Sequence, residues 1–400
     1  MGKFLSRERF GKPQVLAGLL LLVFVSECSW LVAHSAPNMV SEQDTARVQE
    51  GLEQWHGHGT AGTPATQRET SSEWVRNSDY DPDHSPLWYL TGAAPLAVLG
   101  PAPISALGLW LAHFPYILFG VLLGASVWYV SRRLYGNAGG YIALALYCFS
   151  PAVVRSSALW FAPPDIGGAW GTFGAVFTAI AVSHTLYAPR EVILWNWRRI
   201  VLLGISLALA VGSKFSLALI IPVLMVFMMY LAPGRRSAAL VILSAASVVG
   251  LVLLLAAYFF HPEIFWQSWK HARLLTASPV ALGMKGAYLQ MLKEMRASGP
   301  VLVVLVPVAL GTYTLWSRSR YFGNTAPLFM GLLFVALRVA SPHDPDSVFS
   351  LIGVVFLFVF VAGIMADLLE TNARALAGAV LTGLIAANAL WSLIGLVRIR

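Results

Sequence analysis

The composition of this 400-residue chain excludes an ordinary soluble globular protein. Hydrophobic residues make up 57% of it and charged residues only 12%, whereas a soluble domain is typically about 25% charged. The formal net charge of +8 does not indicate nucleic-acid binding, because the lysines and arginines lie mostly in short clusters between apolar runs. These runs are about as long as a membrane-spanning helix requires, roughly 20 residues. We therefore predict an integral membrane protein with no nucleic-acid partner.

Taken in chain order, the apolar runs predict an all-α, polytopic transmembrane bundle of about eleven spans. The first run is preceded by a basic segment, and Ala33-His34-Ser35-Ala36 also fits a signal-peptide cleavage site. We favour an uncleaved helix because the run is long for such a peptide. The whole chain, 1–400, is expected to form a single transmembrane domain. The expected spans cover residues 15–34, 104–130, 138–157, 166–187, 200–213, 215–232, 238–260, 300–316, 325–341, 348–366 and 375–397.

The uncharged region from Leu87 to Val130 is too long for one helix. Pro101 and Pro103 divide it, since proline disrupts a helix interior. We expect the first part to be a re-entrant or interfacial helix beside the membrane and the second part to be a true span.

The distribution of lysine and arginine predicts that the N-terminus lies inside a cytoplasmic-type inner or plasma membrane. Two long loops then face outside, over residues 35–86 and 261–299. The first holds nine of the nineteen acidic residues, and the second is basic and aromatic. Lipid tolerates no unsatisfied backbone, so these loops lie above the membrane or line a cavity. An acidic and a basic loop on one side of the bundle predict a site between them, facing outside.

The first candidate residue lies at the start of the first outer loop. Ser41 and Asp44 form a Ser-x-x-Asp pattern that is typical of a capping box opening an amphipathic helix. Helical spacing puts Asp44 on one stripe with Val48, Leu52 and Trp55. A carboxyl on such a stripe would be partly desolvated and a better general base. The alternative is an ordinary cap carboxylate.

A second cluster follows at Asp79, Asp81, Asp83 and His84, just before an apolar helix. Clustered carboxylates with an imidazole suit a divalent cation such as Mg²⁺ or Mn²⁺, or an acid/base role. The candidate metal ligands are Asp44, Asp81 and Asp83. The alternative is a solvated, proline-bounded helix entry, because Pro82 and Pro86 flank the turn.

Single ionisable residues between later spans form a third set. Asp165 is either a helix cap or a second acid facing the same cavity. Lys214 lies between two short apolar runs, where it either binds phosphate or extends to the interface. In the second outer loop, Lys270 and Arg273 could hold the phosphate of an anionic lipid or belong to a generic interfacial helix. Further polar groups within or beside apolar runs are Glu27, His113, Arg338 and the turn 341–346.

Four stretches together resemble the GT-C superfamily of integral-membrane glycosyltransferases, in its branch of protein mannosyltransferases and aminoarabinose transferases. Ser41 to Trp55 resembles the acidic helix of the first loop, and Asp83 to Tyr89 resembles a "D-x-K-P-P-L-x-Y" turn. Tyr135-Gly136 through Ser150-Pro151 and Asp165 resembles the run around the third and fourth spans. Gly204 through Gly212-Ser213-Lys214 and Pro222 resembles a glycine-rich lysine segment. The likeness covers about residues 10–235, and the rest agrees only in hydropathy.

The resemblance implies a polyprenyl-phosphate-linked sugar donor, an acceptor hydroxyl on the outer side and inversion at the anomeric carbon. Asp44 then takes the place of the general base. Some members of the family use a divalent metal and others do not. His84-Ser85-Pro86 stands where the family often has Lys-Pro-Pro, so binding of the carrier phosphate would pass to His84, Lys214 or a basic residue of loop 261–299.

Two other classes remain open from the sequence. A secondary transporter or flippase would show inverted repeats and charges near the bilayer midplane, whereas no repeat is found here and the polar groups gather in outer loops. A catalytically silent scaffold subunit of a membrane complex would explain the departure at His84-Ser85-Pro86. The acidic cluster and the basic loop favour the glycosyltransferase, because a phosphate leaving group needs cationic stabilisation.

Overall fold

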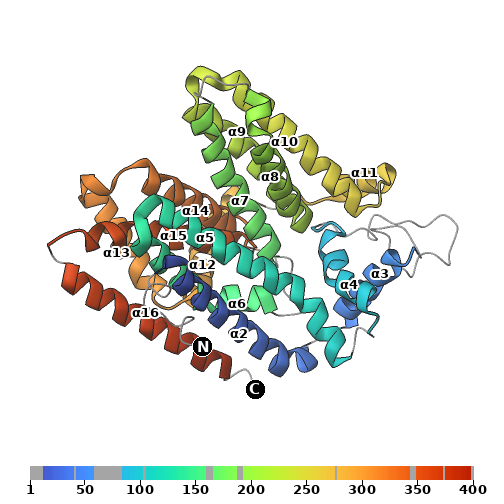
Figure 1. Ribbon diagram of the computed structural model, residues 1–400, viewed down its shortest axis with the longest axis horizontal. Helices are drawn as coiled ribbons and strands as arrows, with labels where there is room; N and C mark the ends of the chain where they lie inside the picture. The colour runs from blue at the N-terminus through green and yellow to red at the C-terminus, as the bar shows by residue number, and fades with distance from the viewer. Residues whose placement is uncertain are drawn as a thin grey trace. The chain divides into compact units, whose positions relative to one another are not determined.

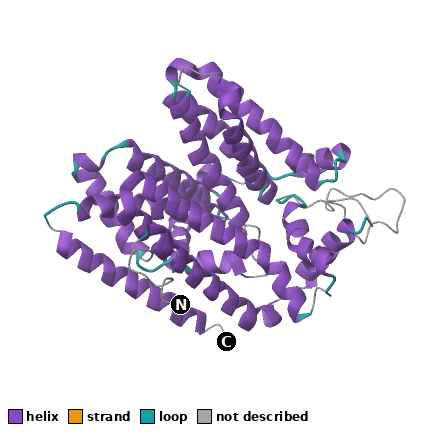
Figure 2. Ribbon diagram, in the orientation of Figure 1, coloured by secondary structure: helices purple, strands orange, loops and turns teal. Residues whose placement is uncertain are grey.

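The computed structural model describes residues 12–39, 42–57, 83–101, 105–158, 165–186, 192–274, 277–342, 348–372 and 374–397. Over these residues every regular element is a helix and no strand occurs, which confirms the all-α prediction (Figure 2). The chain divides into two compact units, and each is described by itself. Unit 1 groups Met1–Asn38, Ile117–Ile166 and Ala277–Arg400, and unit 2 groups Met39–Tyr116 and Gly167–Thr276. Whether they form one domain stays a prediction.

Seven described helices are long and apolar enough to cross a membrane, or eight if the bent pair α12–α13 is one span. The predicted spans 200–213, 215–232 and 300–316 differ from this set. The first is the end of a longer helix, and the second is a short 3-10 and α-helical pair. The third is the second half of a pair bent by 108°.

One long helix, α5 (Ala106–Cys148), replaces two predicted spans. A straight helix of 43 residues would be about 64 Å long, roughly twice the hydrocarbon thickness. Gly136 leaves the helical conformation at φ 72° and ψ −171°. Such a backbone is easily adopted only by glycine, so this residue breaks the helix where the sequence predicts a change of span.

Unit 1 is built around α15 (Val348–Leu369), whose residues 348–366 are all buried. A helix that is apolar on every side is stable only when neighbours surround it. Its most extensive contact is with α14 (Phe322–Ala340), which runs along it (Figure 1). The other elements of unit 1 are α2 (Pro13–Met39), most of α5, α6 (Pro151–Ala158), η4 (Pro279–Gly283), α12 (Lys285–Ser298), α13 (Leu302–Leu315), η5 (Ser317–Ser319) and α16 (Arg374–Val397).

An ion pair fixes the amphipathic helix α12 to the membrane helix α14. The Arg338 guanidinium donates to both carboxylate oxygens of Glu294, with a shortest distance of 2.6 Å, and also to the Ser341 carbonyl at 2.8 Å. Only 8% of the Arg338 side chain and 18% of the Glu294 side chain are exposed. Arg338, singled out in the sequence as an ionisable residue of an apolar run, is therefore part of a structural ion pair.

Unit 2 contains most of the first outer loop and residues 261–276 of the second, the two loops between which the sequence predicts a site. Its long helices α8 (Val192–Ser213) and α10 (Arg236–Ala257) pack side by side (Figure 1). The predicted division of residues 87–130 is confirmed, because α4 (Leu87–Leu99) ends at Gly100 and α5 starts after Pro101 and Pro103. The remaining elements are α3 (Glu42–Trp55), the start of α5, α7 (Asp165–Thr185), η2 (Phe215–Leu219), α9 (Ile220–Leu231), η3 (Pro233–Arg235) and α11 (Pro262–His271).

Candidate functional site

The turn that begins at Asp83 is hydrogen-bonded to the C-terminal end of α8. The backbone N–H of Ser85 donates to the Gly212 carbonyl at 3.2 Å, and the Ser85 hydroxyl donates to the same oxygen at 2.7 Å. One residue beyond Lys214, the N–H of Phe215 donates to the Asp83 carbonyl at 2.9 Å. These bonds satisfy backbone groups at a helix end, which would otherwise be unpaired, and bring Asp83 and His84 next to the Lys214 segment.

Gly212 allows this close approach. A Cβ atom at this position would lie 2.6 Å from Leu87 Cδ2, 3.1 Å from Leu254 Cδ2 and 3.3 Å from Ser85 Oγ. A larger side chain would therefore have to displace the side chains of Leu87 and Ser85 in the Asp83 turn, or that of Leu254. Ser85 and Gly212 shape the candidate site, and the sequence reasoning did not assign either a role, although both lie inside the stretches that carry the family resemblance.

Lys214 lies in a short extended segment between α8 and η2. Its backbone has φ −153° and ψ 123°, and its N–H still donates to the Ala210 carbonyl at 3.1 Å. Only 3% of the residue is exposed. A buried lysine at the end of an apolar helix is uncommon, so Lys214 remains a candidate functional residue.

Arg273 lies opposite Asp83. Its Nη1 atom lies 3.6 Å from Asp83 Oδ2, with 58% of the Arg273 side chain exposed and 16% of the Asp83 side chain. The arginine is the second residue after α11. That helix is held in place by an apolar cluster that contains Phe215, and its Phe265 and Trp269 side chains pack against this cluster. The Phe215 and Trp269 rings meet edge to face, with 5.7 Å between their centroids. The first and second outer loops thus meet through one acidic and one basic side chain.

A strained turn sets the direction of α11. Phe259 and Phe260, between α10 and α11, both have positive φ values of 50° and 57°. Bulky residues rarely adopt this conformation, which costs roughly 1–2 kcal/mol per residue. The Phe259 ring also meets the Trp55 ring edge to face at 5.8 Å. The turn that leads into the second outer loop therefore also contacts the first outer loop within unit 2.

Helix α3 forms as predicted, but its buried face differs from the expected stripe. Val48, Gly51 and Gln54 are buried, whereas Trp55 is 47% exposed. The reason is that α4 packs closely against Gly51, where a Cβ atom would lie 2.9 Å from the Tyr89 carbonyl oxygen. Asp44 lies in the first turn of α3, one helical turn before Val48, and its side chain lies outside the described residues.

His84 is joined to α3 through an aromatic contact. The His84 ring packs edge to face on Trp88 at 6.2 Å, and the Arg47 guanidinium lies over the same indole at 5.5 Å. Arg47 is a further cation of this region that sequence reasoning missed. The sequence could have indicated it, because Arg47 lies three residues after Asp44, and residues three apart on a helix are neighbours on its surface.

The structure does not bring every predicted residue to this cluster. Lys270 is exposed on α11, and its Nζ atom lies over the Trp266 ring at 5.7 Å. Asp165 is buried at the first position of α7 and is grouped with unit 1, so its predicted part in the same site stays a prediction. Within the second outer loop, residues 277–299 also belong to unit 1. The predicted turn residues 343–346 lie outside the described part of the chain.

The described side chains do not form a metal site. Among them, no three His, Cys, Asp or Glu residues lie together in a way that could hold an ion. Of the three candidates, Asp81 and the side chain of Asp44 lie outside the described residues, and Asp83 faces Arg273 at 3.6 Å. A carboxylate opposed by a guanidinium offers a cation little net charge, so Asp83 alone does not favour a divalent ion, and the predicted metal ligands Asp44 and Asp81 stay untested.

Comparison with a family model gives a match over residues 102–266, with the family described as dolichyl-phosphate-mannose-protein mannosyltransferase. The matched region includes α7, the Lys214 segment and the first half of α11, but covers less than half of the chain. No curated protein matches the sequence.

Solved structures match over almost the whole chain. The apo form of ArnT from Cupriavidus metallidurans has a TM-score of 0.60 at 14% identity, covering 91% of this chain and 61% of ArnT. The same protein bound to undecaprenyl phosphate has a TM-score of 0.59 at 13% identity, covering 96% and 70%. AglB from Archaeoglobus fulgidus, in complex with an inhibitory peptide and a dolichol-phosphate, has a TM-score of 0.62 at 14% identity, covering 96% and 55%. This chain thus spans 61% of apo ArnT and 55% of AglB, and at this identity the likeness establishes a shared fold.

Proposed function

Because the chain has the fold of the GT-C superfamily of integral-membrane glycosyltransferases, we propose that it transfers a sugar from a polyprenyl-phosphate-linked donor to an acceptor hydroxyl. ArnT and AglB have been solved with undecaprenyl phosphate and dolichol-phosphate respectively, and this chain resembles both. We further propose that the reaction occurs on the extracytoplasmic side of an inner or plasma membrane, with the N-terminus inside. The lysine and arginine bias supports this orientation.

The observation that carries the proposal is the junction of the Asp83 turn with Lys214 and Arg273. Hydrogen bonds from Ser85 and Phe215 fasten the turn to the lysine segment, and Arg273 faces it at 3.6 Å. A lysine and an arginine beside an aromatic helix suit the phosphate and the first isoprene units of a lipid carrier. His84 and Lys270 are further candidate contacts for the phosphate, and Asp165 for the sugar.

The proposed reaction is a single inverting displacement. Asp44 accepts the proton of the acceptor hydroxyl, the hydroxyl oxygen forms a bond to the anomeric carbon, and the bond from that carbon to the phosphate oxygen breaks. The products are the glycosylated acceptor and the polyprenyl phosphate, which keeps the bonding electrons. Lys214 and Arg273 stabilise the charge that develops on this leaving group, where preorganised cations are most effective.

The loose ion pair between Asp83 and Arg273 fits this scheme. At 3.6 Å with an exposed guanidinium, the pair is weak, on the order of 0–1 kcal/mol. Breaking this pair costs little free energy, so a bound phosphate can take the place of Asp83 as the partner of Arg273. Without a phosphate, Asp83 balances the positive charge of Arg273.

One AglB structure is a complex with zinc and sulfate. A divalent cation bound by Asp44 and Asp81 stays a prediction for this chain.

The test is turnover in proteoliposomes with radiolabelled polyprenyl-phospho-sugars and a panel of hydroxyl acceptors. We expect wild type to consume one donor and Asp44→Asn to lower kcat by about 10²- to 10⁴-fold, since general-base catalysis contributes that much. Glu53→Gln, which removes an acid from the same helix, serves as the matched control and should keep its activity. A wild-type protein that consumes no donor would favour the silent scaffold, and a fully active Asp44→Asn variant would reject the assigned base.

A further inference from the structure

Glu27 is an acidic residue inside a membrane-spanning helix of unit 1, and the proposed reaction does not use it. It lies on α2, in the span Pro13–His34, about 21 Å along the axis from Pro13 and about 10 Å from His34. This places it well within a hydrocarbon layer of about 30 Å. Only 4% of the residue is exposed, and neither carboxyl oxygen has a hydrogen-bond partner among the described residues. An ionisable group at such depth is a functional candidate.

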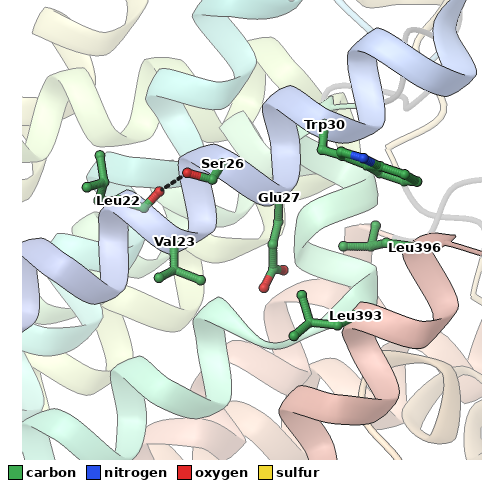
Figure 3. A pocket seen from close by; sticks show the side chains of 7 residues that line it. All are labelled: Leu22, Val23, Ser26, Glu27, Trp30, Leu393 and Leu396. Carbon is green, nitrogen blue, oxygen red and sulfur yellow. Dashed lines mark hydrogen bonds between the residues drawn. The ribbon is translucent and has the colours of Figure 1, made fainter.

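The carboxyl group of Glu27 points into a cavity of about 360 Å³ between α2 and α16, two helices of unit 1 (Figure 3). The walls are mostly apolar. Leu22 on α2 and Leu393 on α16 line the cavity and are themselves 61% and 45% exposed, as expected for side chains at an open groove. The groove therefore has mostly apolar walls and, among its lining residues, a single acidic group, which is itself largely covered.

The remaining polar groups of the groove are suited to a cation. Ser26 donates its hydroxyl proton to the Leu22 carbonyl at 2.9 Å, which leaves the lone pairs of Oγ to accept a further hydrogen bond. Trp30 lines the groove with an indole (Figure 3), whose ring face attracts ammonium and guanidinium groups. A carboxylate, a hydroxyl oxygen and an indole are three ligand types that favour a positive charge.

The depth of the site identifies the source of that charge. Phospholipid ammonium groups lie at the membrane surface, roughly two helical turns from Glu27, and acyl chains offer no polar atom. A lysine or arginine side chain on a neighbouring transmembrane helix can be placed at any depth, and such residues in membranes pair with acidic ones. Polar pairs of this kind also hold transmembrane helices together.

We propose that the groove between α2 and α16 binds a transmembrane helix of another membrane protein, which carries a lysine or arginine at the depth of Glu27. The contrast with Glu294 supports this. That carboxylate is fully paired with Arg338 inside unit 1, whereas Glu27 offers the same chemistry to a partner from outside.

The proposal is tested with synthetic transmembrane peptides in phosphatidylcholine vesicles that contain the full chain. One peptide is a leucine–alanine helix with a single lysine at the depth of Glu27, and its control has leucine there. Association is measured by energy transfer from a fluorophore at the N-terminus of the protein. We expect the lysine peptide to bind at least about tenfold more tightly than the leucine peptide, a difference of about 1.4 kcal/mol, and Glu27→Gln to abolish this preference.

Two further variants keep the test decisive if Glu27→Gln does not fold. Leu393→Trp fills the groove and should prevent binding. Leu376→Trp, on a 70% exposed position of the same helix away from the groove, should not affect it. Equal binding of the two peptides, or a lysine preference that survives in Glu27→Gln or Leu393→Trp, would overturn the proposal. The proposal would also be overturned if wild type, but not Glu27→Gln, retained phosphatidylethanolamine and this lipid displaced the lysine peptide. The occupant of the groove would then be a lipid.

Discussion

Two ion pairs of this protein have the same chemistry and opposite character. In unit 1, Glu294 and Arg338 lie 2.6 Å apart and both side chains are largely buried. In unit 2, Asp83 and Arg273 lie 3.6 Å apart and the arginine is 58% exposed. The buried pair fastens an amphipathic helix to a membrane helix, and each of the three guanidinium nitrogens of Arg338 donates a hydrogen bond within unit 1. The open pair holds two loops together and leaves its guanidinium accessible.

The difference shows why an arginine in an apolar span need not mark a substrate pathway. A buried charge requires a complete set of partners, and Arg338 has them in Glu294 and the Ser341 carbonyl. At a binding site the opposite arrangement is expected, in which a cation is placed by packing around it and only loosely neutralised. Arg273, positioned by the cluster around Trp269, has that arrangement.

The largest predicted effect comes from breaking the buried pair. Glu294→Ala leaves the Arg338 guanidinium buried without its counter-charge, and we expect a loss of about 3–5 kcal/mol in the free energy of unfolding. Thermal or denaturant unfolding in detergent micelles measures it. The double variant with methionine at both positions should lose much less, because two apolar side chains replace the pair. A single variant as stable as wild type would mean that the pair does not fasten α12.

A smaller loss is expected at the point where the Asp83 turn meets α8. Gly212→Val introduces atoms where Leu87 and Ser85 already lie, and overpacking of this kind costs about 1–3 kcal/mol. Because the turn must move, donor KM should rise as well. Gly311→Val is the matched control, since nothing lies within 4 Å of a Cβ there. If both variants behave alike, close approach at Gly212 is not what positions the turn.

Removing one hydrogen bond of the same junction should have a still smaller effect. Ser85→Ala loses the buried bond to the Gly212 carbonyl, and we expect a decrease of about 1 kcal/mol in unfolding free energy. Ser126→Ala, which removes only a bond within its own helix, should change stability by less than about 0.5 kcal/mol. Equilibrium unfolding of the two variants side by side gives the comparison, and equal losses would contradict the role of Ser85.

The smallest stability effect is expected at the open pair itself. Arg273→Ala should change unfolding free energy by less than about 1 kcal/mol, because exposed pairs contribute little. If Arg273 binds the donor phosphate, however, donor KM should rise several-fold, and the salt dependence of KM should weaken with the loss of the charge. Arg273→Lys should retain most of the donor affinity. A KM unchanged in Arg273→Ala would leave the guanidinium without a part in donor binding.

Local patterns in the sequence predicted the helices well. The apolar runs gave the all-α membrane fold, Ser41-x-x-Asp44 indicated the helix over 42–55, and Pro101 and Pro103 divided α4 from α5. The buried face of α3 was predicted less well, because the face that packs is chosen by the approach of α4 to Gly51. The span count also differed. Two predicted spans form the single helix α5, 200–213 and 215–232 are not among the candidate spans, and 300–316 is half of a pair bent by 108°.

The sequence by itself determined that the chain is a helical membrane protein and which residues could carry chemistry, Asp44, Asp83 and Lys214 among them. Only the tertiary structure decided that Arg273 faces Asp83, that Arg338 is held by Glu294 and that the Glu27 carboxyl group has no hydrogen-bond partner among the described residues. The reason is physical. Helix formation and apolarity repeat over a few residues and can be recognised locally. Side-chain partners lie 44 residues apart for Arg338 and 127 for Ser85, so packing alone selects them.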